Sequence, residues 1–213
     1  MKVLELFAGT RSISKAFERA GHECFTVEFD TTHPNISWYA PVERVLPEDI
    51  LERFGHPNVI WASPPCTTYS VASIGHHRYE DPFTHNLEPK TDKARHADEL
   101  VSYTLDLIRA LKPEVWFIEN PRGALRKTRF MADLPRYTVT YCQYGDTRQK
   151  PTDIWTNHPD PQFRPPCKSG DPCHERAPRG SRTGTQGIKG AKLRSVIPND
   201  LCEHIVEICE KVI

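Results

Sequence analysis

Short, mainly apolar runs predict the strands of this chain. They lie at residues 3–6, 24–28, 59–62 and 115–119. Runs of this length without polar alternation are typical of strands buried on both faces of a sheet. Residues 137–142 alternate more weakly between apolar and polar and predict a further strand, with 153–156 as its pairing partner.

Apolar residues at helical spacing separate these runs. Residues 13–20 carry one such stripe, which Ser12 can cap and Gly21 can end. A second helix is predicted to end near Pro113, and its stripe is Ala97, Leu100, Val101, Leu105, Ile108 and Leu111. Strands that alternate with helices favour an α/β fold with a mostly parallel sheet and helices on both faces.

This alternation stops after residue 157. Prolines and glycines are frequent over residues 158–193 and exclude long regular elements there. Pro198-Asn199-Asp200 then starts a last helix, whose apolar face is Leu201, Ile205, Ile208 and Val212. We therefore divide the chain into a core at 1–157, an irregular segment at 158–193 and a C-terminal helix at 194–213 that returns to the core.

Composition places the chain among globular proteins. Its 213 residues suffice for one domain with a sizeable core, and 38% of them are hydrophobic. No apolar run approaches a membrane span, and the N-terminus has no signal-peptide pattern. Seven cysteines without a paired framework indicate a reducing setting. We therefore expect a cytoplasmic protein without membrane association.

Charge is balanced over the chain but concentrated in the irregular segment. The 28 basic and 28 acidic residues cancel. Between residues 158 and 194, however, three acidic residues accompany eight basic ones, which are Arg164, Lys168, Arg176, Arg179, Arg182, Lys189, Lys192 and Arg194. An excess of five positive charges indicates a polyanionic partner, and the plainer alternative is a solvated loop with incidental charge.

The most informative stretch is Ser63-Pro64-Pro65-Cys66. Two prolines cannot continue a sheet, so the strand at 59–62 ends there and holds a cysteine just past its carboxyl end. In open α/β sheets this edge carries ligands and chemistry. A lone cysteine is more often a core residue. Here, however, Phe7-Ala8-Gly9 and Glu119-Asn120-Pro121 also lie at strand ends.

In this order the three segments resemble the DNA (cytosine-5) methyltransferase family. They match its cofactor loop, its Pro-Cys nucleophile and its Glu-Asn pair. The resemblance covers about residues 3–155 and, more weakly, 193–208. It implies a Rossmann-like S-adenosylmethionine-dependent methyltransferase fold. It also implies an enzyme that methylates carbon 5 of cytosine in duplex DNA, with S-adenosyl-L-methionine as cofactor and no obligate protein partner.

The resemblance makes Cys66 the nucleophile. A thiolate that adds to carbon 6 of cytosine turns carbon 5 into a nucleophile, and the thiolate can later leave. Cys66 then needs a lowered pKa, which a helix start or a neighbouring cation can supply. Burial raises the pKa of Glu119, which can donate a proton to N3 of the base. We expect Asn120 to fix the turn that orients both groups.

A cofactor site is expected at the first strand end. A small residue allows a tight turn in Phe7-Ala8-Gly9-Thr10, and Glu28, about 20 residues on, can accept hydrogen bonds from ribose hydroxyls. Arg11 stands where the family has glycine, and it can contact the cofactor carboxylate or point to solvent. The resemblance adds three further cofactor contacts, which are Pro64, the adenine-binding pair Asp49-Ile50, and Ser195-Val196 of the last motif.

A basic motif and a long connection complete the resemblance. The family's Gln-x-Arg-x-Arg pattern falls on Gln143 to Thr152, where Arg148 and Lys150 are expected to support the cysteine side of the base. If neither reaches the base, they contact phosphate. Residues 71–96 have little apolar periodicity. They are expected to form the lid that accompanies base flipping, with a long disordered loop as the alternative.

Residues 158–193 occupy the place of the family's target-recognition region. The segment is short and basic, so it can follow phosphates, and we predict relaxed or short-site specificity. Cys167, Cys173 and His174, with His158 nearby, can bind zinc. Their Cys-x5-Cys-His spacing is not a recognised finger pattern, however, so we assign no metal site.

Two other functions fit some of these residues. The same site can modify cytosine in RNA, where the target is a flipped single-stranded loop or a minor groove lined by 2′-hydroxyls. Alternatively, the protein is a catalytically silent binder that uses the basic segment. The presence of both Cys66 and Glu119 argues against a silent binder.

Overall fold

A computed structural model describes residues 1–175 and 190–213 of the chain. Within these residues one sheet has the strand order β3-β2-β1-β4-β7-β9-β8, and β5 and β6 form a separate hairpin. The strands are β1 (Lys2–Leu6), β2 (Glu23–Glu28), β3 (Trp38–Tyr39), β4 (Val59–Ala62), β5 (Arg78–Glu80), β6 (Leu87–Pro89), β7 (Val115–Pro121), β8 (Arg136–Thr140) and β9 (Pro151–Thr156).

Helices connect most of these strands. The α-helices are α1 (Ser12–Arg19), α2 (Pro47–Arg53), α3 (Ile74–His77), α4 (Asp92–Leu111), α5 (Ala191–Ser195) and α6 (Asn199–Glu210). Three 3₁₀ turns, η1 (Val42–Arg44), η2 (Ala124–Lys127) and η3 (Tyr141–Tyr144), lie between them. None of the helices in the described ranges is long and apolar enough to cross a membrane.

The sheet is parallel except at one side. β3, β2, β1, β4 and β7 run parallel, whereas β9 lies antiparallel between β7 and β8. The predicted strands are confirmed, including the pairing of 137–142 with 153–156, although β8 ends at Thr140 and η3 follows. The prediction of an α/β fold with a mostly parallel sheet is therefore confirmed.

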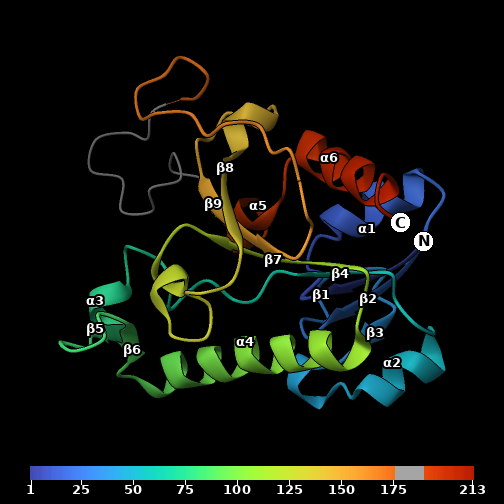
Figure 1. The fold of residues 1–213 in the computed structure, drawn as a ribbon, viewed down its shortest axis with the longest axis horizontal. Helices are drawn as coiled ribbons and strands as arrows, with labels where there is room; N and C mark the ends of the chain where they lie inside the picture. The colour runs from blue at the N-terminus through green and yellow to red at the C-terminus, as the bar shows by residue number, and fades with distance from the viewer. Residues whose placement is uncertain (176–189) are drawn as a thin grey trace.

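Two hydrophobic cores lie on opposite faces of the sheet. α4, α2 and the turns η1 and η2 pack on one face, and α1 and α6 pack on the other. Figure 1 shows this arrangement, with α4 and α2 below the strands and α1 and α6 above them. The predicted two-sided covering of the sheet is confirmed.

Strand register brings the three strand-end motifs to one edge. Leu6 lies opposite Ala62, and Ala62 lies opposite Ile118. The residues that follow these three, namely Phe7, Ser63 and Glu119, are therefore neighbours at the carboxyl edge of the sheet. Parallel pairing alone produces this result, because strands that run in the same direction end at the same side.

α1 begins differently from our prediction. Ser12 is its first residue rather than its cap, and Arg11 is the N-cap residue with φ near 57°. The buried carboxylate of Glu5 on β1 accepts hydrogen bonds from the Ser14 amide (2.9 Å) and from the Ser14 hydroxyl. The Glu5 carboxylate of the neighbouring strand thus accepts a hydrogen bond from the first turn of α1, as the side chain of an N-cap residue usually does.

Residues 71–96 are more regular than a disordered loop. They contain α3 and the β5–β6 hairpin, and α4 starts at Asp92, where the Thr91 hydroxyl caps it by accepting a hydrogen bond from Ala94 N (3.3 Å). Arg78 is buried, and its guanidinium donates to the Asp98 carboxylate at 2.7 and 3.1 Å. The expected lid therefore includes a hairpin anchored to α4.

The C-terminal part also departs from our prediction. Two helices, α5 and α6, replace the single one, and Val212 lies beyond α6 and is 44% exposed, so it does not belong to the apolar face. Residues 158–175 contain no helix or strand. Four of the basic residues, Arg176, Arg179, Arg182 and Lys189, lie outside the described residues.

Candidate active site

One cavity of about 580 Å³ opens at the carboxyl edge of the sheet. It brings together nine of the predicted site residues, which are Phe7, Ala8, Gly9, Thr10, Pro64, Cys66, Glu119, Lys150 and Ser195. These residues come from the ends of β1, β4, β7 and β9 and from the segment before α6. The sheet edge therefore gathers residues that are distant in sequence into one site.

The loop after β1 has an unusual backbone conformation. Phe7 and Gly9 have φ of 55° and 48°, a region that bulky side chains rarely adopt. The Ala8 amide donates to Val27 O (3.0 Å), and the Gly9 amide donates to Glu28 Oε2 (2.8 Å). These bonds hold the loop tightly against the end of β2, so that its backbone faces the cavity. Such strain is typical of loops that approach a ligand closely.

Glu28, Asp49 and Ile50, three further expected cofactor residues, do not line the cavity, and Glu28 contacts a residue that does. Glu28 is half-buried behind Gly9, and its Oε1 accepts from the Asp30 amide (2.9 Å). Asp49 and Ile50 do not line the cavity. Ile50 is fully buried in the core under α4, and the Asp49 carboxylate accepts from Leu46 N (3.2 Å) at the start of α2. The structure therefore does not support the expected adenine contact by this pair.

Arg11 follows neither of the two alternatives. Its guanidinium forms an ion pair with Glu18, about two helical turns further along α1. Its side chain is mostly covered, and its buried Nε has no hydrogen-bond partner. The bulky side chain that replaces the family's glycine is thus folded back along the helix.

Cys66 is exposed to the cavity at the start of a turn. Its carbonyl accepts hydrogen bonds from the amides of Tyr69 and Ser70, both at 3.0 Å. The pKa of its thiol is raised, because the surrounding walls desolvate the thiolate and the Glu119 carboxylate repels it. The Lys150 ammonium acts in the opposite direction. The expectation of a lowered thiol pKa is thus wrong for the ligand-free protein, although the neighbouring cation is present.

Glu119 is buried near the end of β7. Its Oε1 accepts a hydrogen bond from the Tyr141 hydroxyl (3.2 Å). Burial raises the pKa of the carboxyl, against the lowering effects of Lys150 and of the Tyr141 and Ser63 hydrogen bonds. This direction confirms the expectation that burial favours the protonated acid. A buried acid that opens into a cavity can donate a proton to a bound base.

Asn120 holds the loop that carries Cys66. Its Nδ2 donates to Pro64 O at 2.9 Å, and the side chain is buried. Glu119 and Asn120 are adjacent on β7, so one side chain faces the cavity while the other braces the neighbouring loop. This contact joins Asn120 to the loop that it was expected to fix, and the part that Asn120 plays in the reaction stays a prediction.

Lys150 and Arg148 have different places. Lys150 lines the cavity, donates to Arg194 O (2.9 Å), and has its pKa lowered by burial. Arg148 is buried away from the cavity, where it pairs with Asp146 and donates to the carbonyls of residues 193, 194 and 196. Arg148 therefore does not line the cavity, and its expected contact with base or phosphate stays a prediction. Its hydrogen bonds hold the segment that places Ser195 in the cavity. Val196 does not line the cavity, and its carbonyl accepts one of these hydrogen bonds from Arg148.

Sequence reasoning did not single out Glu5, nor Gly123, which packs against the turn after Cys66 without lining the cavity. Glu5 lines the cavity, and burial raises the pKa of its carboxyl to about 7. A Cβ atom at Gly123 would lie 2.2 Å from the carbonyl oxygen of Tyr69, the residue three positions after Cys66. An acid inside an apolar strand and a glycine just after Glu119-Asn120-Pro121 are signals that the sequence contains, since both are costly unless the structure requires them.

Comparison with known proteins agrees with this site. Residues 1–133 match the family described as C-5 cytosine-specific DNA methylase. The probable DNA (cytosine-5)-methyltransferase of Frog virus 3 (isolate Goorha) is 30% identical over 227 residues, a match that covers 98% of this chain and all of that protein.

Solved structures share the fold. One is an E. coli prophage-encoded protein described as a DNA modification methyltransferase (TM-score 0.53, 18% identity), and another is the S. pombe Dnmt2 methyltransferase (TM-score 0.50, 13% identity). Each match covers 73% of this chain but only 46% and 48% of the respective solved chain. The predicted Rossmann-like methyltransferase fold is thereby confirmed.

Proposed function

Since this chain belongs to the C-5 cytosine-specific DNA methylase family and is a DNA (cytosine-5)-methyltransferase, we propose that it methylates carbon 5 of a flipped-out cytosine through a covalent Cys66 adduct. The observation that carries the proposal is the shared cavity. An exposed thiol, a buried carboxyl and an ammonium group, from Cys66, Glu119 and Lys150, line the same space.

The cavity also suits S-adenosyl-L-methionine as the methyl donor. Its volume of about 580 Å³ lies in the range of small-molecule sites. The strained loop of residues 7–10 exposes backbone to it, and Glu28 lies directly behind that loop. We propose that this loop, Pro64 and Ser195 hold the cofactor, with Glu28 near its ribose. When bound, S-adenosylmethionine supplies an electrophilic methyl group.

Cys66 and Glu119 then divide the chemistry on the base. The Cys66 thiolate forms a bond to carbon 6, and Glu119 in its protonated form donates its proton to N3, so that no full negative charge accumulates on the ring. Carbon 5 of the resulting enamine would attack the methyl carbon, whose bond to the sulfonium sulfur would break so that the neutral thioether leaves. Loss of the proton from carbon 5 to a base, cleavage of the bond between carbon 6 and the Cys66 sulfur, and return of the N3 proton to Glu119 then restore the thiolate, the protonated acid and a neutral aromatic ring.

Lys150 and Asn120 support these steps. The Lys150 ammonium lowers the pKa of Cys66 and so increases the fraction of thiolate. Asn120 keeps the loop of Pro64 in register with Glu119 through its 2.9 Å hydrogen bond. Both groups act by placing charge and backbone before the substrate arrives, which avoids reorganisation during the reaction.

Recognition of DNA is proposed for the basic segment at 158–193. Contacts between its basic side chains and phosphates would confer affinity without reading bases, so we retain the prediction of relaxed or short-site specificity. A base inside a duplex cannot reach Cys66, so it must flip out at a cost of a few kcal/mol. A methylation map with a sharply defined six-base-pair site would contradict the specificity prediction.

The decisive experiment is expression in a host without cytosine methylation. Wild type and Cys66→Ala are expressed, the DNA is digested to nucleosides, and 5-methylcytosine is measured by mass spectrometry. We expect 5-methylcytosine with wild type and none with Cys66→Ala, because the variant lacks the nucleophile. Cys24→Ala, which removes a half-buried cysteine outside the cavity, is the matched control and should retain activity.

Two outcomes would contradict the proposal. If Cys66→Ala methylates as well as wild type, the covalent mechanism is wrong. If folded wild type binds S-adenosylmethionine but leaves DNA unmodified while methylating tRNA in a parallel assay, the substrate is RNA. Competition between duplex DNA and tRNA for the purified protein distinguishes these substrates directly.

A further inference from the structure

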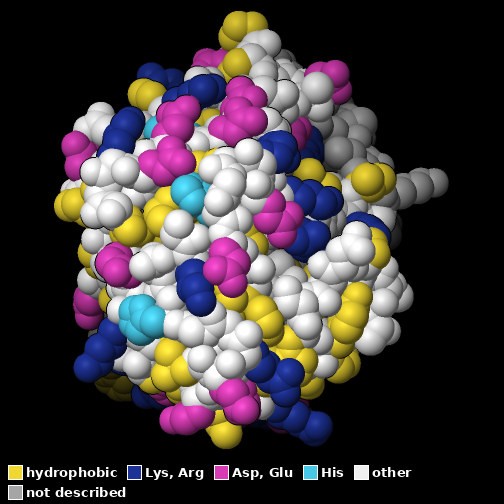
Figure 2. Space-filling model, turned by 90° about the vertical axis from the view of Figure 1, so that its right-hand side faces the viewer, with side chains coloured by type: hydrophobic (Ala, Val, Ile, Leu, Met, Phe, Trp, Pro, Cys, Tyr) yellow, Lys and Arg dark blue, Asp and Glu magenta, His cyan; other side chains and the backbone are white. Residues whose placement is uncertain are grey.

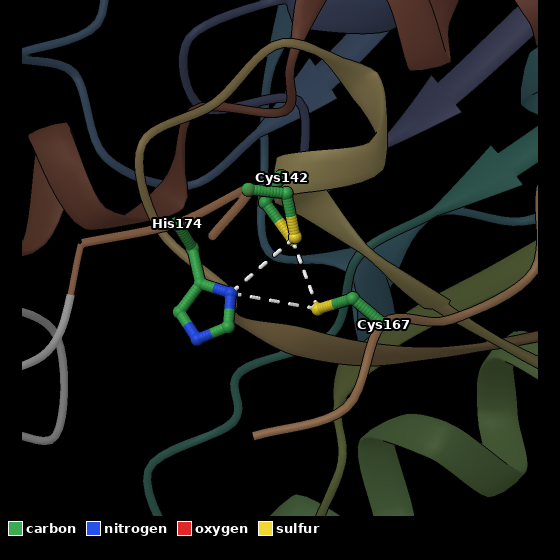
Figure 3. A group of neighbouring side chains, drawn as sticks. Cys142, Cys167 and His174 are labelled. Carbon is green, nitrogen blue, oxygen red and sulfur yellow. Dashed lines mark hydrogen bonds between the residues drawn. The ribbon is translucent and has the colours of Figure 1, made fainter. Parts of the chain in front are cut away.

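Three cysteines and one histidine converge outside the candidate active site. The Sγ atoms of Cys142, Cys167 and Cys173 and a ring nitrogen of His174 all lie within 4.8 Å of one another. All three cysteines are free thiols. Figure 3 shows the sulfurs of Cys142 and Cys167 and a ring nitrogen of His174 directed toward a common centre. Convergence of four soft ligands on one point is the arrangement of a metal site.

The four residues come from two separate parts of the chain. Cys142 lies in η3, directly after β8, whereas the other three lie in the irregular stretch after β9. His158, which the sequence placed near this group, is engaged elsewhere. Its Nε2 lies 3.0 Å from Ile208 O, and its Nδ1 accepts from Asp160 N (3.1 Å). The fourth ligand is thus a cysteine that is distant in sequence.

Three distances within the group are close to those of a tetrahedral zinc site, and the Cys142–Cys167 separation is shorter. With Zn–S near 2.3 Å and Zn–N near 2.0–2.1 Å, a tetrahedron places sulfurs about 3.8 Å apart and sulfur and nitrogen about 3.6 Å apart. Cys142 and Cys173 are separated by 3.6 Å and Cys142 and Cys167 by 3.1 Å. His174 Nδ1 lies 3.6 Å from Cys167 Sγ and 3.5 Å from Cys173 Sγ.

We propose that Cys142, Cys167, Cys173 and His174 bind one structural zinc ion. Four protein ligands fill a tetrahedral shell and leave no open position, which is the pattern of structural rather than catalytic zinc. A disulfide is the competing state of two neighbouring cysteines. The 3.1 Å between Cys142 and Cys167 is well beyond an S–S bond of about 2.05 Å, and a disulfide would leave Cys173 and His174 without a common function.

Neighbouring amides support thiolates at this place. Gln149 Nε2 donates to Cys167 Sγ (3.4 Å), and Gln143 Nε2 donates to Cys173 Sγ (3.5 Å). The Cys167 amide donates to the Thr140 hydroxyl (3.0 Å), which fixes the backbone of that ligand. Hydrogen bonds from outside the ligand shell orient ligands and stabilise the charge on sulfur.

The ion would join the basic segment to the active-site strand. Gln149 precedes Lys150, which lines the cavity, and the Glu175 amide donates to Thr147 O (2.9 Å). Zinc at this point would therefore fix the first part of the segment at 158–193 beside the loop that presents Lys150. This role is structural, and it does not depend on which nucleic acid the protein methylates.

Metal content of the full chain tests the proposal. The protein is expressed in zinc-supplemented medium, purified under reducing conditions, and analysed by mass spectrometry of the metals. We expect about one zinc ion per chain in wild type and far less in Cys142→Ser and in Cys173→Ser. Cys66→Ser is the matched control, because it removes an exposed cysteine outside the group and should keep its zinc. Cys173 is exposed, so its replacement leaves the core intact.

Cobalt provides a second measurement on the unchanged chain. Co²⁺ exchanged into wild type should give the thiolate charge-transfer and visible bands of a tetrahedral sulfur-rich site, and added Zn²⁺ should abolish them. Folded, reduced wild type that binds neither metal would overturn the proposal. Equal zinc in wild type and both cluster variants would do the same, as would a Cys142–Cys167 disulfide in metal-free protein purified without oxidant.

Discussion

Three ionisable side chains share the candidate active site, and each changes the proton affinity of the others. The Glu119 carboxylate raises the pKa of Cys66, and Lys150 lowers it. Lys150 also lowers the pKa of Glu119, which burial raises. Protonation of Glu119 removes a repulsive charge beside Cys66, so the acid form of one group favours the nucleophilic form of the other. The two protonation states that the reaction needs are therefore compatible.

Replacement of Lys150 should make Cys66 less reactive. In Lys150→Met the thiolate loses the cation that lowers its pKa most, so the pKa of Cys66 rises further. We expect alkylation of Cys66 by iodoacetamide at pH 8 to slow by about tenfold, the effect of one pKa unit. The rate is followed by peptide mass spectrometry across a pH series. Lys15→Met, on the exposed side of α1, is the control, and an unchanged midpoint in Lys150→Met would contradict the prediction.

At the scale of elements, each catalytic loop is held by a neighbouring element rather than by itself. Glu5 of β1 binds the start of α1, and Asn120 of β7 binds the loop after β4. Gly123 lets the chain after β7 pass close to the Cys66 turn, where the Ala124 amide donates to Tyr69 O at 2.7 Å. Stability and site geometry should therefore change together when these contacts are altered.

Glu5 should make stability depend on pH. Burial raises its pKa from 4.5 to about 7, so between these values the folded state holds a proton that the unfolded state has lost. Its contribution is therefore full below about pH 4.5 and declines as pH rises to 7. The shift corresponds to about 3 kcal/mol.

Glu5→Gln, which has no proton to lose, should remove this decline. Urea unfolding at pH 5 and pH 8 should show that the variant's free energy of unfolding improves relative to wild type at the higher pH. Glu43→Gln, at an exposed site on η1, should show a constant difference. A constant difference for Glu5→Gln as well would refute the assignment.

Gly123→Ala should disturb the Cys66 turn. The new Cβ would meet Tyr69 O at 2.2 Å, so the backbone of one loop must move. We expect a loss of about 1–3 kcal/mol in the free energy of unfolding, typical of overpacking, together with reduced methylation. Gly75→Ala is the control, because a Cβ at that position meets nothing within 4 Å. Wild-type stability and activity in Gly123→Ala would show that the close approach is unimportant.

At the scale of the whole molecule, charge is distributed unevenly. On the face that carries both termini, acidic and basic side chains intermix (Figure 2), as in the ion pair of Arg19 with Glu203 at 3.7 Å. The sequence instead concentrates basic residues at 158–194. Binding to a polyanion should therefore depend on that segment more than on the terminal face, and it should weaken as salt rises.

Charge removal within the segment should change the salt dependence of DNA binding. If Arg179 and Arg182 contact phosphates, Arg179→Gln/Arg182→Gln should reduce the slope of log K against log salt by about 1.8, at about 0.9 per contact. Arg19→Gln/Arg109→Gln removes the same charge from two exposed ion pairs and should leave the slope unchanged. If both double variants show the same slope of log K against log salt, the segment does not contact phosphates and the proposed interface is wrong.

The sequence by itself determined the sheet core and the reactive edge. Mainly apolar runs, and the prolines at the ends of β4 and β7, are local signals, so β1, β4 and β7 were predictable, and so was the placement of Phe7, Cys66 and Glu119 at the ends of these strands. Parallel strands share one carboxyl edge, so strand ends alone imply that these residues meet. Burial of Glu119 was predictable as well, because Glu119 ends an apolar run that forms a central strand.

Only the tertiary structure decided which of the remaining residues meet. Arg148 and Lys150 are two residues apart, yet the turn before β9 directs Lys150 into the cavity and Arg148 toward the carbonyls of residues 193–196. Cys142 meets Cys167 because the irregular stretch after β9 runs back to the end of β8, where the Cys167 amide donates to the Thr140 hydroxyl. Such pairings depend on strand order and chain reversal. No local pattern encodes them, because the contacting residues are far apart in sequence.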